Sequence, residues 1–88
     1  QGEFSVALNL YEKSLSIGKT YLPDSHPAFS NTYGRMADTC RMLGEYSMAI
    51  QYYQKVLAIR QKTLPPEHPS FCTLYNNIAC VYQETKDY

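Results

Sequence analysis

The chain repeats itself with a period of 42 residues, and this period restricts its possible folds more than any other feature. Gly2-Glu3-Phe4 aligns with Gly44-Glu45-Tyr46. The identities continue without a gap through Ala7 and Ala49, Tyr11 and Tyr53, Leu22-Pro23 and Leu64-Pro65, His26-Pro27 and His68-Pro69, Tyr33 and Tyr75, and Ala37 and Ala79. In chains with a fixed period of this size, each unit buries its apolar face against its neighbours, as in a solenoid. The sequence therefore predicts a repeat array, and repeat arrays mostly serve as binding proteins.

Charge and hydropathy argue against several classes of protein. Eight basic residues balance eight acidic residues, so the formal net charge is zero. A general binder of nucleic acid or of membrane surfaces needs a basic excess to attract phosphates, and we expect neither partner. No apolar run approaches the length of a membrane span, and no signal-peptide pattern opens the chain. The first residue is Gln1 rather than methionine, so we expect the chain to be part of a longer protein.

The cysteines and histidines do not have the spacing of a metal site. Cys40, Cys72 and Cys80 are odd in number and lack CxxC spacing, which favours reduced thiols in a cytoplasmic protein over a disulfide framework. His26 and His68 occupy the same place in each repeat linker. We interpret both histidines as capping or packing residues at the start of a helix, with a general-base or ligand role as the alternative. A zinc site would need four closely grouped ligands, so we expect no metal and no cofactor.

Apolar spacing within each period predicts two helices. The larger apolar residues fall on one stripe with the 3.6-residue period of a helix, first before Gly44 and again after it. Gly44 suits the position just past a helix C-terminus, and Pro65-Pro66 cannot continue a helix. No segment alternates with a period of two, so β-structure is not expected. The pattern predicts four helices, over residues 4–20, 27–43, 45–62 and 70–85.

The repeat boundaries divide the chain into three parts. Residues 1–21 contain the second helix of one repeat, residues 22–63 form a complete repeat, and residues 64–88 contain the first helix of a third repeat. With A and B for the first and second helix of a repeat, the order along the chain is B-A-B-A. The fold class is therefore all-α, with antiparallel helices in a single array and no second domain.

The residues at the packing positions of this period resemble the tetratricopeptide repeat. Small and aromatic residues occupy the family's positions in the middle unit (Tyr33, Met36-Ala37, Cys40, Gly44-Glu45-Tyr46, Ala49-Ile50, Tyr53, Val56-Leu57) and in the third unit (Tyr75, Ile78-Ala79, Tyr82, Tyr88). The usual period of this family is 34 residues. The longer period here, the two Leu-Pro-x-x-His-Pro linkers and the segment Tyr75-Asn76-Asn77-Ile78-Ala79 are similar to the kinesin light chain subfamily. The resemblance implies an α-solenoid of antiparallel helix pairs.

The resemblance also implies where a ligand binds. In this family the first helices of successive repeats line a concave surface, and extended peptides lie across it. An asparagine early in such a helix often holds the peptide backbone, because one amide both donates and accepts hydrogen bonds. The middle unit departs from this pattern with Gly34-Arg35, so equal engagement of both units is in doubt. The residues that we predict to bind peptide are Arg35, Asp38, Arg41, Asn76, Asn77, Cys80 and Gln83.

The charged residues of the middle unit admit two interpretations. Arg35 and Arg41 could bind a carboxylate of the ligand in a bidentate way, although Asp38 between them would cancel part of the field. Alternatively, these three residues form a solvated face with i, i+3 ion pairs that stabilise the helix by about 0.2–0.5 kcal/mol each. The sequence leaves both interpretations open.

No catalytic constellation is visible in the sequence, so we do not expect an enzyme. The leading hypothesis is a non-enzymatic interaction module that binds short linear peptides of a protein partner. The alternatives are a structural scaffold or self-stacking segment without a peptide ligand, and an accessory repeat array of a larger multidomain protein. Each end lacks one helix neighbour, which predicts head-to-tail association between molecules. The residues affected are Phe4, Ala7, Leu8 and Tyr11 at one end, and Ile78, Ala79 and Tyr82 at the other.

Overall fold

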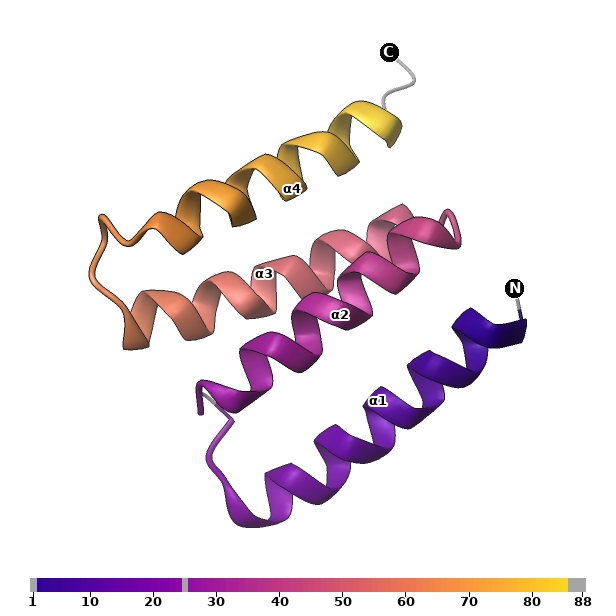
Figure 1. Cartoon of the computed structure of the whole chain (residues 1–88), viewed down its shortest axis with the longest axis horizontal. Coiled ribbons are helices and arrows are strands. Elements are labelled where there is room, and N and C mark those ends of the chain that lie inside the picture. Colours follow the sequence, from indigo (N-terminus) through magenta and orange to yellow (C-terminus); the bar gives the residue numbers. More distant parts are fainter. Residues whose placement is uncertain (1, 25, 86–88) are drawn as a thin grey trace.

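The computed structural model describes residues 2–24 and 26–85, and these residues form four α-helices joined by short linkers (Figure 1). The helices are α1 (Gly2–Tyr21), α2 (Ala28–Met42), α3 (Tyr46–Thr63) and α4 (Pro69–Thr85). Each helix runs antiparallel to the one before it (Figure 1). The prediction of an all-α fold built from antiparallel helix pairs is confirmed, and the predicted ranges agree with the observed bounds to within about two residues. None of these described helices is apolar over enough of its length to cross a bilayer.

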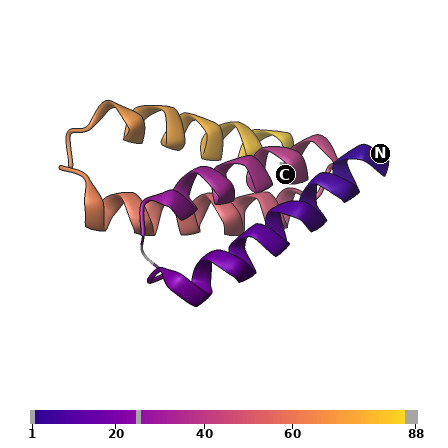
Figure 2. The same ribbon diagram turned by 60° about the horizontal axis from the view of Figure 1, so that its bottom comes forward.

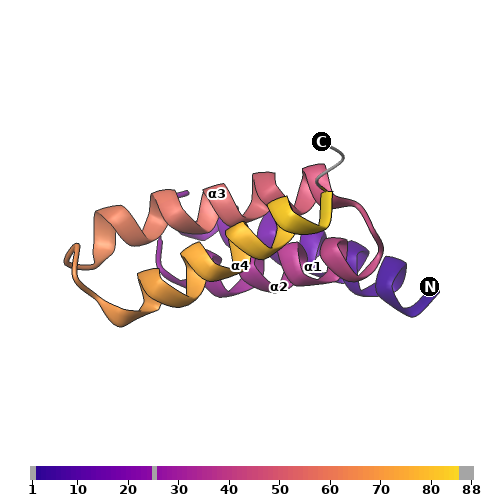
Figure 3. The same cartoon turned by 90° about the horizontal axis from the view of Figure 1, so that it is seen from above.

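Helices α2 and α3 form the central pair of the molecule. Helix α1 packs on α2, and α4 packs on α3, so that α1 and α4 lie at opposite edges (Figure 2). Seen from above, α2 and α3 lie in different layers (Figure 3). The extents of 41 × 36 × 16 Å describe a thin slab rather than a sphere. Each helix therefore buries its apolar stripe against its neighbours along the chain, as in a solenoid.

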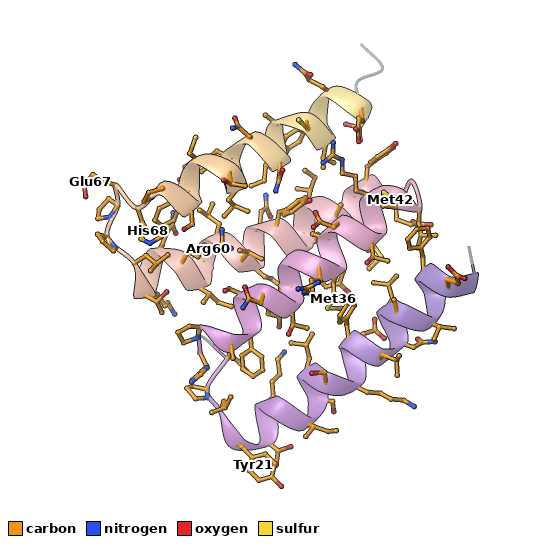
Figure 4. All side chains as sticks on the ribbon, in the orientation of Figure 1. Tyr21, Met36, Met42, Arg60, Glu67 and His68 are labelled. Atoms are coloured by element: carbon orange, nitrogen blue, oxygen red, sulfur yellow. The ribbon has the colours of Figure 1, made fainter. Side chains whose placement is uncertain are left out.

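The core lies where α2 crosses α3 and extends toward both edges of the slab. Ala37 and Ala49 are completely buried, and their small side chains suit a close approach of two helices. Met36 is also completely buried and lies near the middle of the molecule (Figure 4). Burial raises the pKa of the Cys40 thiol, which keeps it protonated and unreactive. The other members of the core are Leu15, Phe29, Tyr33, Tyr53, Val56, Ile59, Leu74 and Val81.

Gly44 ends α2 in the way that the sequence predicts. Its φ of 81° lies in the left-handed region, where glycine meets no steric penalty. The amide of Glu45 donates to the carbonyl of Cys40 at 2.8 Å, and the amide of Gly44 donates to the carbonyl of Arg41 at 3.0 Å. This pair of bonds is a Schellman motif, which satisfies two carbonyls that the helix end would otherwise leave without donors. The chain can therefore reverse direction into α3 within three residues.

The two linkers that contain histidine share their backbone hydrogen bonds and their histidine caps, and His68 Nδ1 also lies 2.9 Å from Ser70 Oγ. His26 Nδ1 accepts the amide proton of Ala28 at 3.1 Å, and His68 Nδ1 accepts the amide proton of Ser70 at 3.1 Å. The amides of Phe29 and Phe71 each donate to the carbonyl of the histidine three residues earlier, at 3.0 Å. Each imidazole thus satisfies a free amide at a helix N-terminus, as a capping side chain does. The structure supports the capping interpretation of both histidines.

Replacing these caps tests their contribution to stability. We expect His26→Ala and His68→Ala each to lower the free energy of unfolding by about 0.5–2 kcal/mol, because one N-terminal amide loses its acceptor. His26→Asn and His68→Asn should lower it by less, since the asparagine oxygen can accept the same proton. Urea unfolding of the four variants measures the difference. Equal losses for alanine and asparagine would show that the rings act through packing instead.

Candidate functional site

A polar groove runs between α2 and α4, the two helices that correspond to each other under the 42-residue period. Its volume is about 360 Å³, within the usual range for ligand sites. Side chains of α2 and α4 form its walls, and side chains of α3 form its floor. We call it the α2–α4 groove, and its lining residues are Ser30, Asn31, Gly34, Arg35, Asp38, Tyr53, Val56, Arg60, Thr73, Leu74 and Asn77.

The structure brings together some of the predicted peptide-binding residues and separates others. Arg35, Asp38 and Asn77 all line the α2–α4 groove. Arg41 lines an adjoining hollow of about 490 Å³ toward the C-terminal ends of the same two helices, together with Asp38 and Glu84. The remaining predicted residues, Asn76, Cys80 and Gln83, are exposed on α4 and line neither space. Peptide binding by all seven residues stays a prediction.

A buried tyrosine of α3 fixes the position of the Asp38 side chain. The Tyr53 hydroxyl donates a hydrogen bond to Asp38 Oδ1 across the α2–α3 contact. Burial raises the pKa of Tyr53, and the hydrogen bond to Asp38 raises it further. Because this bond occupies one carboxylate oxygen and fixes the other, Asp38 presents a charged acceptor in a defined position on the wall of the groove.

Arg41 pairs with α4 rather than with its neighbours on α2. Its Nε donates to Glu84 Oε1 at 3.1 Å, and its Nη2 donates to Glu84 Oε2 at 3.0 Å. This bidentate bond lowers the pKa of Glu84 and joins α2 to α4 beside the groove. Of the two interpretations of these charges, the one with i, i+3 ion pairs among Arg35, Asp38 and Arg41 is not borne out for the described residues, where Arg41 pairs with Glu84 of α4 instead.

The sequence interpretation missed Arg60 as a lining residue of the groove. Arg60 lies near the end of α3, on the side toward α4 (Figure 4), and its Nη1 donates to the carbonyl of Ser70 at 3.2 Å. One period earlier the same position holds Gly18, so the two repeats differ most in size at this point. The replacement of glycine by a large charged residue in one of the two repeats was a signal in the sequence. It was missed because only the first helix of each repeat was considered as a source of ligand contacts.

The groove offers hydrogen-bond donors and acceptors but no catalytic arrangement. Two arginines, one aspartate and the amides of Asn31 and Asn77 face the same space, so peptide groups could bind in either orientation. Both histidines lie in linkers, where their Nδ1 atoms accept backbone protons. Among residues 2–24 and 26–85, no three His, Cys, Asp or Glu side chains group as metal ligands do.

Comparison with known protein families agrees with this architecture. The family model described as "Tetratricopeptide repeat" matches residues 1–62 and, in a second overlapping match, residues 28–88. The two matches overlap and together cover the whole chain. A search of curated proteins finds none that matches the chain.

Proposed function

Because the chain belongs to the tetratricopeptide repeat family, whose repeats generally mediate protein–protein interactions, we propose that it binds a short linear peptide of a protein partner in the α2–α4 groove. One observation carries this proposal: the lining of the groove combines charged and amide side chains from two corresponding helices over a floor supplied by α3. Repeat modules of this kind are typically non-catalytic. The proposed role is therefore recognition, with no chemical step.

The polar lining fits an extended peptide better than it fits an apolar ligand. Asn77 is half-buried, so its amide is partly shielded from competing water and can bond a peptide N–H and C=O together. Arg35 and Arg60 add two positive charges and Asp38 adds one negative charge. A ligand that carries a carboxylate gains from both arginines, whereas the main-chain bonds do not depend on its sequence.

We infer further that the repeats are of the kinesin light chain-like type and act in the cytoplasm, with residues 22–63 as the complete repeat. The period of 42 residues and the same backbone hydrogen bonds in both Leu-Pro-x-x-His-Pro linkers support the subtype. The three cysteines are free thiols, which fits a reducing compartment.

Head-to-tail association stays a second proposal, and the exposure of α4 favours it. Tyr75 and Tyr82 of α4 are 51% and 55% exposed, whereas their counterparts Tyr33 and Cys40 on α2 are buried beneath α3. A helix with the pattern of α3, such as α1 of a second molecule, would cover them. Light scattering across a concentration series tests this, and a strictly monomeric species at high concentration would contradict it.

Two neighbouring asparagines on α4 provide a matched test of the groove. The chain contains no tryptophan, so the emission of tryptophan-containing peptides, acidic and neutral, reports binding without background. We expect at least one peptide to give a saturable shift. Asn77→Ala should weaken its binding about tenfold, because one or two hydrogen bonds are lost. Asn76→Ala should change it less than about twofold, because Asn76 lies outside the groove.

The melting temperatures of both variants should stay close to that of the parent chain, since neither residue belongs to the core. If no peptide gives a saturable shift while the protein is folded, the scaffold interpretation becomes the better one. If Asn76→Ala weakens binding as much as Asn77→Ala, the peptide lies on the outer side of α4 and the groove is not its site.

A further inference from the structure

A second pocket opens on the opposite face of the slab from the α2–α4 groove. Its walls come from the C-terminal halves of α1 and α3, and Tyr33 of α2 contributes to its floor. Its volume is about 320 Å³, within the range of ligand sites. Lys19, Lys55 and Lys62 line it, and Asp24 is the one acidic lining residue in the described part of the chain. We call it the lysine pocket.

Two of these lysines lie over the same aromatic ring. The Nζ atoms of Lys19 and Lys55 are 5.8 Å and 5.7 Å from the centre of the Tyr33 ring. Tyr33 is only 6% exposed and stacks on Tyr52 at 6.1 Å, so the ring is held in place. Attraction between an ammonium group and a ring face keeps both lysines near the pocket. Hydrogen bonding to Tyr33 also raises the pKa of Lys19, so this lysine stays charged.

Asp24 is the one carboxylate that lines the pocket beside the three lysines in the described part of the chain, and it forms no ion pair with them. Across residues 2–24 and 26–85, no ion pair involves any of them. Lys19 and Lys62 lie in the last turns of α1 and α3, where a positive charge interacts favourably with the negative end of the helix dipole. That role does not explain Lys55, which lies in the middle of α3. Like charges that share one ring repel each other, and a bound anion would relieve this repulsion.

We propose that the lysine pocket binds a phosphate monoester carried by a protein partner. Three lysines and one aspartate give the pocket a formal charge of +2, and a phosphate monoester carries about −1.5 to −2 at neutral pH. A carboxylate carries less charge and is matched best by the planar fork of an arginine. No arginine lines this pocket among the described residues. Glu12 lies in an adjoining hollow that shares Lys19, Tyr33 and Lys55, and it does not line the pocket itself.

A protein is the favoured source of the phosphate because repeats of this family have protein partners. The phosphorylated segment would bind on the face that the α2–α4 groove does not use. The two sites are therefore independent, and loss of one leaves the other to be tested separately. A partner long enough to contact both faces would bind with added avidity.

The repeat supplies a matched control for the test. Lys13 corresponds to Lys55 one period earlier and is also exposed, but it lines neither the pocket nor the adjoining hollow. The chain is titrated at constant ionic strength with an alanine tripeptide that has phosphoserine at its centre, and with the same peptide lacking phosphate. Backbone amide chemical shifts are followed by NMR. The phosphopeptide should give saturable shifts around Tyr33, and the unmodified peptide should give none.

Lys55→Gln and Lys62→Gln should each weaken this binding about fivefold, as expected for loss of one exposed charge contact, while Lys13→Gln leaves it within about twofold. Equal weakening by Lys13→Gln would overturn the proposal, because general electrostatic attraction would then explain the shifts. Vesicles that contain a phosphoinositide test the other source of phosphate. If the chain sediments with these vesicles, the Lys55→Gln variant does not, and the phosphopeptide gives no saturable shift, then a protein is not the source of the phosphate. Shifts that rise linearly without saturation would overturn the site itself.

Discussion

Replacing Tyr53 with alanine should lower the free energy of unfolding by about 3–5 kcal/mol, as is typical when a large aromatic side chain is removed from a core. Tyr53 is 2% exposed and is the largest of the fully buried side chains. It belongs to the core between α2 and α3 and also contributes to the floor of the α2–α4 groove. A domain of this size has a total stability of about 5–15 kcal/mol, so the variant should lose a large share of it. Urea unfolding followed by circular dichroism measures the loss.

Tyr53→Phe separates packing from hydrogen bonding at the same position. The phenylalanine ring fills the same space and removes only the hydroxyl that donates to Asp38. Because the Asp38 side chain is exposed, water can replace the lost donor, and we expect a cost of about 0.5–1.5 kcal/mol. If the phenylalanine variant were as unstable as the alanine variant, the hydrogen bond to Asp38 would be the main stabilising contact and the cavity argument would fail.

The same variant gives an alkaline pH dependence with a defined sign. Burial, and then the hydrogen bond to Asp38, raise the pKa of Tyr53 above its ordinary value of 10.0. A raised pKa means that the folded chain holds this proton more tightly than the unfolded chain does. The contribution of Tyr53 is therefore fully present below pH 10.0 and is lost as the pH rises above that value. Tyr53→Phe should lose less stability than the parent chain over this alkaline range.

The fold could be predicted because its determinants are local and occur twice. Gly44 needs only its own backbone conformation to end α2, and the two histidines cap amides that lie two residues away. The apolar stripes fix which face of each helix is buried, and the period shows that the same solution applies to each unit. Each of these features depends on neighbours within a few residues, so each could be recognised without knowledge of the packing angles.

The candidate site could be predicted only in part because it depends on contacts between helices. Asn76 and Asn77 differ by about 100° around α4, and only the packing of α4 on α3 determines which one faces α2. The Arg41–Glu84 pair joins residues 43 positions apart, so helical spacing along α2 could not reveal it. Arg60 enters the groove from α3, a helix that the family resemblance does not associate with ligand contact.

Gly18→Ala should destabilise the protein even though alanine is the better helix former. A Cβ atom at this position would lie 2.7 Å from Cε1 and 3.2 Å from Cζ of the Phe29 ring, so the ring or the helix must shift. Phe29 is buried, and overpacking of this kind costs about 1–3 kcal/mol. The gain in helix propensity is only about 0.5–1 kcal/mol, so the clash prevails. Urea unfolding gives the net loss, and hydrogen exchange should show faster opening of α1.

Gly34→Ala is the matched control, because a Cβ atom there meets no atom within 4 Å. It should stabilise the chain by about 0.5–1 kcal/mol through helix propensity alone. The double variant Gly18→Ala with Phe29→Leu should be more stable than the sum of its two single changes predicts, since the smaller side chain leaves room for the new methyl group. Strict additivity would mean that the methyl group and the ring do not meet. The contact between this methyl group and the Phe29 ring would then not explain the loss of stability in Gly18→Ala.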